Sequence, residues 1–137
     1  MDNIKFGKRV QPFFELSPYH YRGIRIDNMT WRTLIHYWCG CYFKEPYMKE
    51  YICTTNNIPT ILKECSLKGM DDFDKIEPNK IIFGITEKFR QHKDLKSILL
   101  TTGSVDLIYD GVGFLAENNR YGRILMNLRR RYDIEQT

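Results

Sequence analysis

The sequence lacks the features of membrane and secreted proteins. No hydrophobic run reaches the roughly 18 uncharged residues that a membrane span needs. The first residues, MDNIKFGKRV, carry charge but no apolar segment of the kind found in a signal peptide. Internal repeats and low-complexity stretches are also missing. These absences weigh against membrane, secreted and coiled-coil proteins. They predict a location in the cytoplasm or within an intracellular or viral assembly.

The spacing of a metal site is missing as well. The four cysteines are Cys39, Cys41, Cys53 and Cys65. The first two stand closer together than in the usual zinc knuckle, and the other two stand alone. The three histidines are scattered along the chain. We therefore expect buried, reduced thiols and no metal site.

Strong charge of one sign is absent. Lys and Arg number 21 against 17 Asp and Glu, so the formal net charge is only +4. This balance permits an anionic partner without demanding one. The densest basic cluster consists of Arg120, Arg123, Arg129, Arg130 and Arg131. The cluster indicates either a face for nucleic acid or cations that complement the end of a helix, and nearby Asp133 and Glu135 favour the second interpretation.

The chain has ordinary globular composition with many aromatic rings. Of its 137 residues, 42% are hydrophobic and 14% are aromatic. This length predicts one domain, residues 1–137, around an aromatic-rich core. The beginning of the chain shows little pattern, so we expect residues 1–13 to form a flexible N-terminal arm.

Hydrophobic periodicity predicts a mostly helical chain. Helices are expected over residues 33–43, 45–52, 58–67, 79–91 and 94–102, followed by a last helix capped by Asn118 or Asn119. A strand and a turn are expected over residues 22–30, joined by the aromatic residues of 13–21. A further strand is expected over 105–109, with loops over 70–78 and 110–117. The predicted fold class is α+β, a predominantly helical single domain with a small β-sheet.

The segment 33–43 is apolar on every side, which predicts a helix at the centre of the core. Thr30 or Thr33 is expected to cap its start, and Asp94 to cap the helix over 94–102. Gly40 weakens a helix by about 1 kcal/mol relative to Ala. We expect the close approach of another backbone to require this glycine.

Five segments, in order along the chain, carry recognisable motifs. Residues 88–103 match the pattern K-F-x-Q-H-x-x-L-x-x-x-L-L-x-T-G, and residues 119–129 resemble N-x-L-G-x-x-L-M-x-x-R. Fainter matches are LSPY at 16–19, IRIDN at 24–28 and WRTLIHY at 31–37, the last to W-P-(S/T)-x-E-H-(Y/F). The ordered set resembles the NADAR or YbiA-like family.

This resemblance implies a single α+β domain with an aromatic cleft. Active members of the family cleave N-glycosidic bonds, some in ribosylated pyrimidine intermediates of riboflavin synthesis and others in ADP-ribosylated guanine. No metal or redox cofactor is expected. The chemistry requires a carboxylate close to the anomeric carbon, because the transition state resembles an oxocarbenium ion.

Several positions depart from the family pattern together. Ile35 stands in place of the motif glutamate and Tyr42 in place of a lysine further along the same helix. Pro18 replaces an asparagine and Tyr109 an acidic residue, and the loop at 110–113 lacks the family tryptophan. Loss of one general acid or base typically costs ~100-fold to 10,000-fold in rate. We expect Ile35, Tyr42 and Tyr109 to fill the former polar cleft.

The first hypothesis is therefore a catalytically inactive member, a structural or interaction subunit of a larger assembly, such as a viral or organellar one. It implies protein partners. The second hypothesis keeps N-glycosidase activity, with His36, Asn119 and Asp110 as a displaced carboxylate. The third is binding of ADP-ribose or a nucleotide without catalysis.

The candidate site residues follow from these hypotheses. The catalytic candidates are His36 and Asp110. The ligand-binding candidates are Ser17, Tyr19, Trp31, Thr33, His36, Asn119 and Gly122. Three of these positions have competing structural interpretations. His36 and Trp31 fit core positions better, the histidine bonded to a carbonyl, while Asn119 fits a helix cap and a ligand contact equally well.

Overall fold

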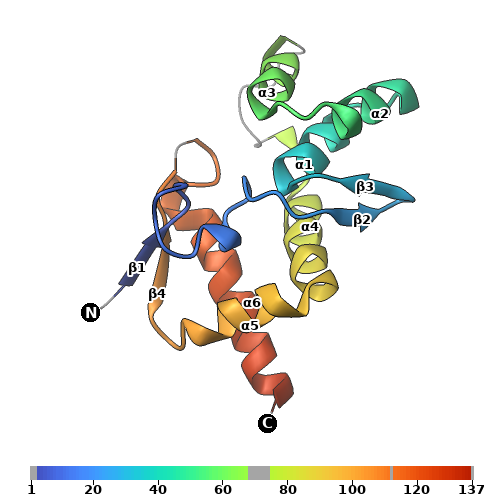
Figure 1. The fold of residues 1–137 in the computed structure, drawn as a ribbon. Coiled ribbons are helices and arrows are strands. Elements are labelled where there is room, and N and C mark those ends of the chain that lie inside the picture. Colours follow the sequence, from blue (N-terminus) through green and yellow to red (C-terminus); the bar gives the residue numbers. More distant parts are fainter. Residues whose placement is uncertain (1–2, 68–74, 112, 137) are drawn as a thin grey trace. The chain divides into compact units, whose positions relative to one another are not determined.

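The computed structural model describes residues 3–67, 75–111 and 113–136 and divides into two compact units (Figure 1). The central unit is Tyr21–Lys88, and the terminal unit combines Met1–His20 with Phe89–Thr137. Helices dominate both units, and strands are few and short. The predicted α+β class with mostly helical content is confirmed. Among the described residues, the strands form two sheets of two strands each, in place of the one small sheet expected.

The central unit begins with a β-hairpin. Strands β2 (Ile24–Ile26) and β3 (Met29–Trp31) pair antiparallel, with Ile24 opposite Trp31. Asp27 and Asn28 form the turn with φ of 56° and 64°. Aspartate and asparagine tolerate this left-handed conformation better than most residues, and it suits a two-residue hairpin turn. The predicted strand and turn are confirmed.

The described residues of the central unit also form four α-helices. They are α1 (Leu34–Tyr42), α2 (Pro46–Thr54), α3 (Ile58–Leu67) and most of α4 (Pro78–Gln91). Helix α1 packs against both α2 and α3, and its residues from Leu34 to Gly40 are all buried. The prediction of a central buried helix is confirmed for this unit. Part of the predicted loop at 70–78 lies outside the described residues, and Pro78 is the first residue of α4.

Gly40 makes room for a ring and not for another backbone. A Cβ atom at this position would lie 2.4 Å from the Trp31 ring. The expectation of a second backbone at Gly40 is wrong, because the indole of β3 lies there. The predicted alternatives for the cap of α1 resolve to Thr33, whose side chain accepts a hydrogen bond from the His36 N–H.

The terminal unit joins the two ends of the chain. Strand β1 (Asn3–Phe6) pairs in parallel with β4 (Asp106–Tyr109). Residues 3–6 were expected within a flexible arm, and they form a strand instead because β4 supplies backbone partners and Phe6 is fully buried. The remaining elements are η1 (Phe14–Leu16), α5 (Lys93–Thr101), η3 (Glu117–Asn119) and α6 (Arg120–Gln136).

Two local predictions in the terminal unit are wrong. Phe14 lies in the short helix η1 and not in a β region. His92 is the N-cap of α5, and Asp94 lies in its first turn. Helix α6 starts at Arg120, directly after the predicted cap positions Asn118 and Asn119, which both have φ of 53° within η3. Among the described residues, no helix is both long and apolar enough to cross a membrane.

Candidate functional site

His36 is held in place on both ring nitrogens. Nε2 lies 2.8 Å from the Thr55 carbonyl oxygen, and Nδ1 lies 2.8 Å from the Thr33 hydroxyl. Because a carbonyl only accepts, Nε2 carries the proton and Nδ1 accepts from the hydroxyl. The side chain is fully buried. This arrangement matches the core interpretation of His36, and a ligand contact there stays a prediction.

The surroundings keep this imidazole neutral. Burial lowers the pKa of His36, and the charge of Arg32 lowers it further, against the opposing effect of the bond to Thr55. In the unfolded chain the pKa returns to about 6.5. Unfolding therefore takes up a proton once the pH falls below that value.

We expect the free energy of unfolding to fall with pH between about 7 and 5.5, by up to about 1.4 kcal/mol per unit. The contribution of His36 is fully present above pH 6.5 and is lost as pH falls toward its lowered folded pKa. Urea denaturation at several pH values measures the slope. His36→Gln should flatten it. Equal slopes in the two proteins would contradict this assignment.

Asn119 joins η3 to strand β4 in the terminal unit. Its side-chain oxygen accepts from the Tyr109 N–H at 2.8 Å, and its amide nitrogen donates to the Leu107 carbonyl at 2.8 Å. Gly122 is buried beside it, in the first turn of α6. A Cβ atom on Gly122 would lie 2.3 Å from the Leu107 carbonyl oxygen. Both residues thus have structural roles, and their predicted ligand contacts are untested.

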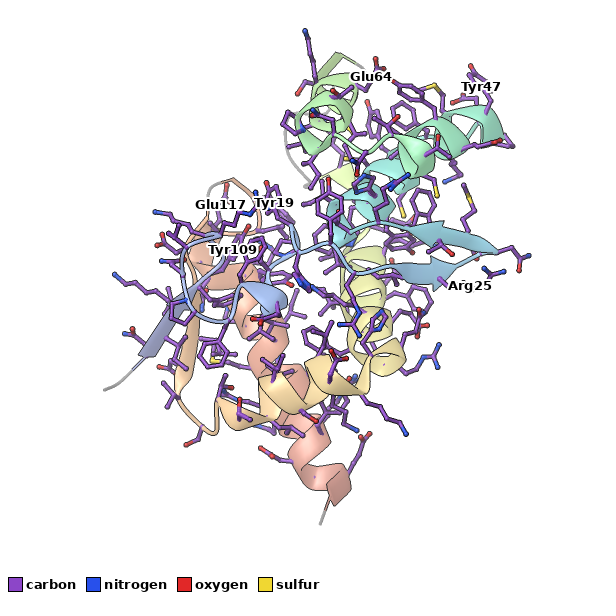
Figure 2. All side chains as sticks on the ribbon, in the orientation of Figure 1. Tyr19, Arg25, Tyr47, Glu64, Tyr109 and Glu117 are labelled. Carbon is purple, nitrogen blue, oxygen red and sulfur yellow. The ribbon has the colours of Figure 1, made fainter. Side chains whose placement is uncertain are left out.

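The other candidates in the terminal unit are Ser17, Tyr19 and Asp110, and Asp110 contacts residues near the start of the chain. Ser17 is buried, and its hydroxyl accepts from the Tyr19 N–H at 3.1 Å. Tyr19 lies near Tyr109 (Figure 2). Asp110 accepts from the Gln11 amide at 2.7 Å and lies 3.5 Å from the Lys8 ammonium. The Gln11 hydrogen bond and the Lys8 charge lower the pKa of Asp110, which favours a carboxylate base over a proton donor.

The predicted site residues thus fall into two groups. Trp31, Thr33 and His36 belong to the central unit, and the structure brings the last two into hydrogen-bond contact. The terminal unit contains Ser17, Tyr19, Asp110, Asn119 and Gly122. Ile35 is 0% exposed in α1. Tyr109 is also buried, and burial raises its pKa, so its phenol stays neutral.

The central unit contains a pocket that no sequence pattern predicts. The pocket has a volume of about 470 Å³ and lies between the hairpin, α1 and the start of α4. Of the predicted candidates only Trp31 lines it. Four lysines line it as well: Lys44, Lys49, Lys75 and Lys80. These lysines come from separate segments and form no motif, so no local sequence signal marks them.

Most of the predicted arginine cluster is used inside the terminal unit. Arg129 is buried and donates to the Thr102 hydroxyl at 2.8 Å. The Arg120 guanidinium lies 3.8 Å from the centre of the Phe114 ring. The Arg123 side chain donates to the Asn118 carbonyl at 2.8 Å. These contacts support the structural interpretation of the cluster, and nucleic-acid binding stays an untested alternative.

The cysteines are free thiols. Cys39, Cys53 and Cys65 are buried, and Cys41 is half-buried at the pocket. In the part of the chain that the structure describes, no three His, Cys, Asp or Glu side chains gather as metal ligands would.

No family model matches the chain. N-glycosidase YbiA of Shigella flexneri is 26% identical over 145 residues, which cover 97% of this chain and 90% of the relative. An N-glycosidase of Nostoc punctiforme is 28% identical over 140 residues, 92% of this chain and 90% of the relative. The NMR structure of Escherichia coli YbiA matches 99% of this chain and 88% of its own, with a TM-score of 0.82 at 22% identity.

In sequence and in fold, the chain is similar to the YbiA/NADAR-like proteins. This similarity agrees with the ordered motifs and with the mostly helical α+β fold. Within the YbiA-like motif at 31–37, Trp31, His36 and Tyr37 match the family pattern, while Ile35 departs from it. The two matching aromatic rings pack edge to face, 5.8 Å between centres.

Proposed function

We propose that the chain is a non-catalytic member of the YbiA/NADAR-like family that acts as a structural or interaction subunit of a larger assembly. The observation that carries this proposal is Ile35, a fully buried apolar side chain where the family motif has glutamate. An isoleucine neither stabilises an oxocarbenium-like transition state nor activates water.

The neighbouring residues do not replace the missing carboxylate. His36 follows Ile35 directly, but both of its ring nitrogens are engaged in hydrogen bonds and its pKa is lowered. Tyr42 stands where the family has a lysine, so a second charged group of the motif is missing. These features together support the loss of N-glycosidase activity, the activity in the names of the relatives.

Exposed apolar side chains support an interaction role. Tyr47 and Tyr51 on α2, together with Ile82 and Phe83 on α4, are exposed large hydrophobic residues of the central unit. Aromatic side chains of this kind are enriched in protein interfaces.

An N-glycosidase assay tests the proposal. The purified chain is incubated with ribosylated pyrimidine and ADP-ribosylated guanine substrates, and released base and sugar are quantified by chromatography. YbiA from Escherichia coli serves as the positive control. We expect no release above the protein-free blank. Release that rises in proportion to the concentration of the chain would overturn the proposal.

N-glycosidase activity with a displaced carboxylate is the second candidate. Asp27 and Glu77 favour it, because both line the lysine-rich pocket of the central unit. Asp110 is the third carboxylate to test. If release is detected, Asp27→Asn, Glu77→Gln or Asp110→Asn should abolish it. The matched control is Glu117→Gln, which changes an exposed carboxylate outside the pocket.

A further inference from the structure

We propose that the central unit binds a nucleoside polyphosphate in two adjoining hollows, with phosphates beside Lys44 and Lys80 and the base against Tyr42 and Tyr47. The first hollow is the lysine pocket described above. The second, which we call the aromatic hollow, has a volume of about 460 Å³ and lies where α1 meets α2. Tyr42 and Lys44 line both hollows, so the two are adjacent.

The lysine pocket carries excess positive charge. Among the described residues that line it, four lysines face two carboxylates, Asp27 and Glu77. Within residues 3–67, 75–111 and 113–136, none of these lysines has a carboxylate within ion-pair distance. Lysine ammonium groups with no carboxylate partner attract phosphate oxygens, and a concave site strengthens that attraction. The excess charge therefore selects an anion with several negative charges.

Two helix ends adjust the field at this pocket. Lys49 donates to the Gly40 carbonyl at 2.9 Å and so offsets the negative end of α1. Glu77 and Lys80 line the pocket at the start of α4, where that helix presents its positive end. Lys49 is therefore fixed by the fold, while Lys44, Lys75 and Lys80 are exposed side chains available to a ligand.

The aromatic hollow supplies a surface for a flat ring. Tyr42 and Phe43 pack edge to face with ring centres 5.1 Å apart. Tyr47 projects from α2 with 70% of its surface exposed (Figure 2). Rings that stack on a tyrosine gain contact area and a favourable quadrupole interaction. A planar base therefore fits this hollow better than a second phosphate does.

This site does not include the position of the missing glutamate. Tyr37 and Cys41, one helical turn apart, line the lysine pocket, whereas Ile35 does not. Nucleotide binding here does not depend on the proposed loss of glycosidase chemistry. A chain that binds nucleotide and also releases base would overturn the proposed function alone.

Titration calorimetry with ATP tests the inference on the full chain. The double variant Lys44→Gln/Lys80→Gln should weaken ATP binding by about tenfold or more, because it removes two charged hydrogen-bond donors. Lys63→Gln is the matched control, an exposed lysine on α3 outside both hollows. Absence of ATP binding, or equal weakening by the control, would overturn the proposal.

Binding of tripolyphosphate, which contains no base, distinguishes the contribution of the base from that of the phosphates. Tyr47→Ala should weaken ATP binding by roughly threefold to tenfold. The same variant should leave tripolyphosphate binding unchanged. Equal weakening of both ligands would contradict a base in the aromatic hollow.

Cys41 reports whether ATP lies in the lysine pocket. It is the half-buried thiol, whereas the other three are buried. Burial raises the pKa of Cys41, while Tyr37, Lys49 and Lys80 lower it. Phosphates beside these lysines should offset their charge and cover the thiol. Labelling by iodoacetamide should then slow severalfold at saturating ATP, with Cys41→Ser identifying the labelled site. An unchanged rate would show that ATP binds elsewhere and would overturn the proposal.

Discussion

Gly122→Ala is expected to lower the free energy of unfolding by about 3 kcal/mol. The added methyl group would lie 2.3 Å from the Leu107 carbonyl oxygen and 2.4 Å from the Asn119 side-chain oxygen. Neither atom is free to move, because Leu107 lies in β4 and Asn119 bonds that strand twice. Relief of the contact therefore separates α6 from β4 or leaves buried polar groups without partners.

Urea denaturation followed by circular dichroism measures this loss. Asn127→Ala is the control, because Asn127 is an exposed residue of the same helix and alanine favours helix. Its stability should equal or slightly exceed that of the original chain. A Gly122→Ala protein as stable as this control would show that α6 and β4 are not in close contact.

Ile35→Glu, which restores the family residue, is expected to destabilise the chain by about 5–7 kcal/mol at pH 7. A glutamate there either buries a charge or takes up a proton. Protonation alone costs about 3.7 kcal/mol at pH 7, given an ordinary pKa of about 4.3. Burial of the polar group without a partner adds about 1–3 kcal/mol. The reversion should therefore cost stability before it restores any chemistry.

The pH dependence of this loss of stability distinguishes the effect of the glutamate's charge from the effect of its shape. A glutamate with a raised folded pKa destabilises most at high pH, so the loss should shrink to about 2–4 kcal/mol at pH 5. Ile35→Gln introduces nearly the same shape and no charge. Its loss should therefore be the same at both pH values. If the loss caused by Ile35→Glu does not change with pH, the introduced carboxylate reaches water and the buried position of Ile35 is wrong.

The features of the fold that depend on neighbouring residues could be predicted from the sequence. Asp27 and Asn28 after alternating residues predict the first strand and the turn of the hairpin, and Thr33 before an apolar run predicts α1. In each case the residues that decide the structure lie within one turn of it. Short-range rules for hairpin turns and helix caps therefore suffice.

The features of the fold that depend on long-range contacts could not be predicted from the sequence. Residues 3–6 become a strand because β4, near the other end of the sequence, supplies the partner. Asn119 has the sequence signature of a helix cap, yet its side chain bonds β4. Gly40 is required by the Trp31 ring, which precedes it by more than two helical turns of chain. Such roles depend on tertiary contacts that no local pattern encodes.

The candidate site also combines features that the sequence predicts with features that it does not predict. The departure at Ile35 is visible in the motif, and the core position of His36 follows from its apolar neighbours. The lysine pocket is not visible, because Lys44 and Lys80 become neighbours of one hollow only after the hairpin, α1 and α4 assemble.

The pairing of β1 with β4 sets an order of events during synthesis. The strand at Asn3–Phe6 leaves the ribosome before its partner at Asp106–Tyr109, which follows only after the whole central unit. Until then Phe6 has no strand beside it, and the loop to be closed is long, with the entropy cost that length brings. The contiguous central unit has all its own segments available earlier. Folding of the nascent chain is therefore expected to start in the middle of the sequence and to finish by joining its ends.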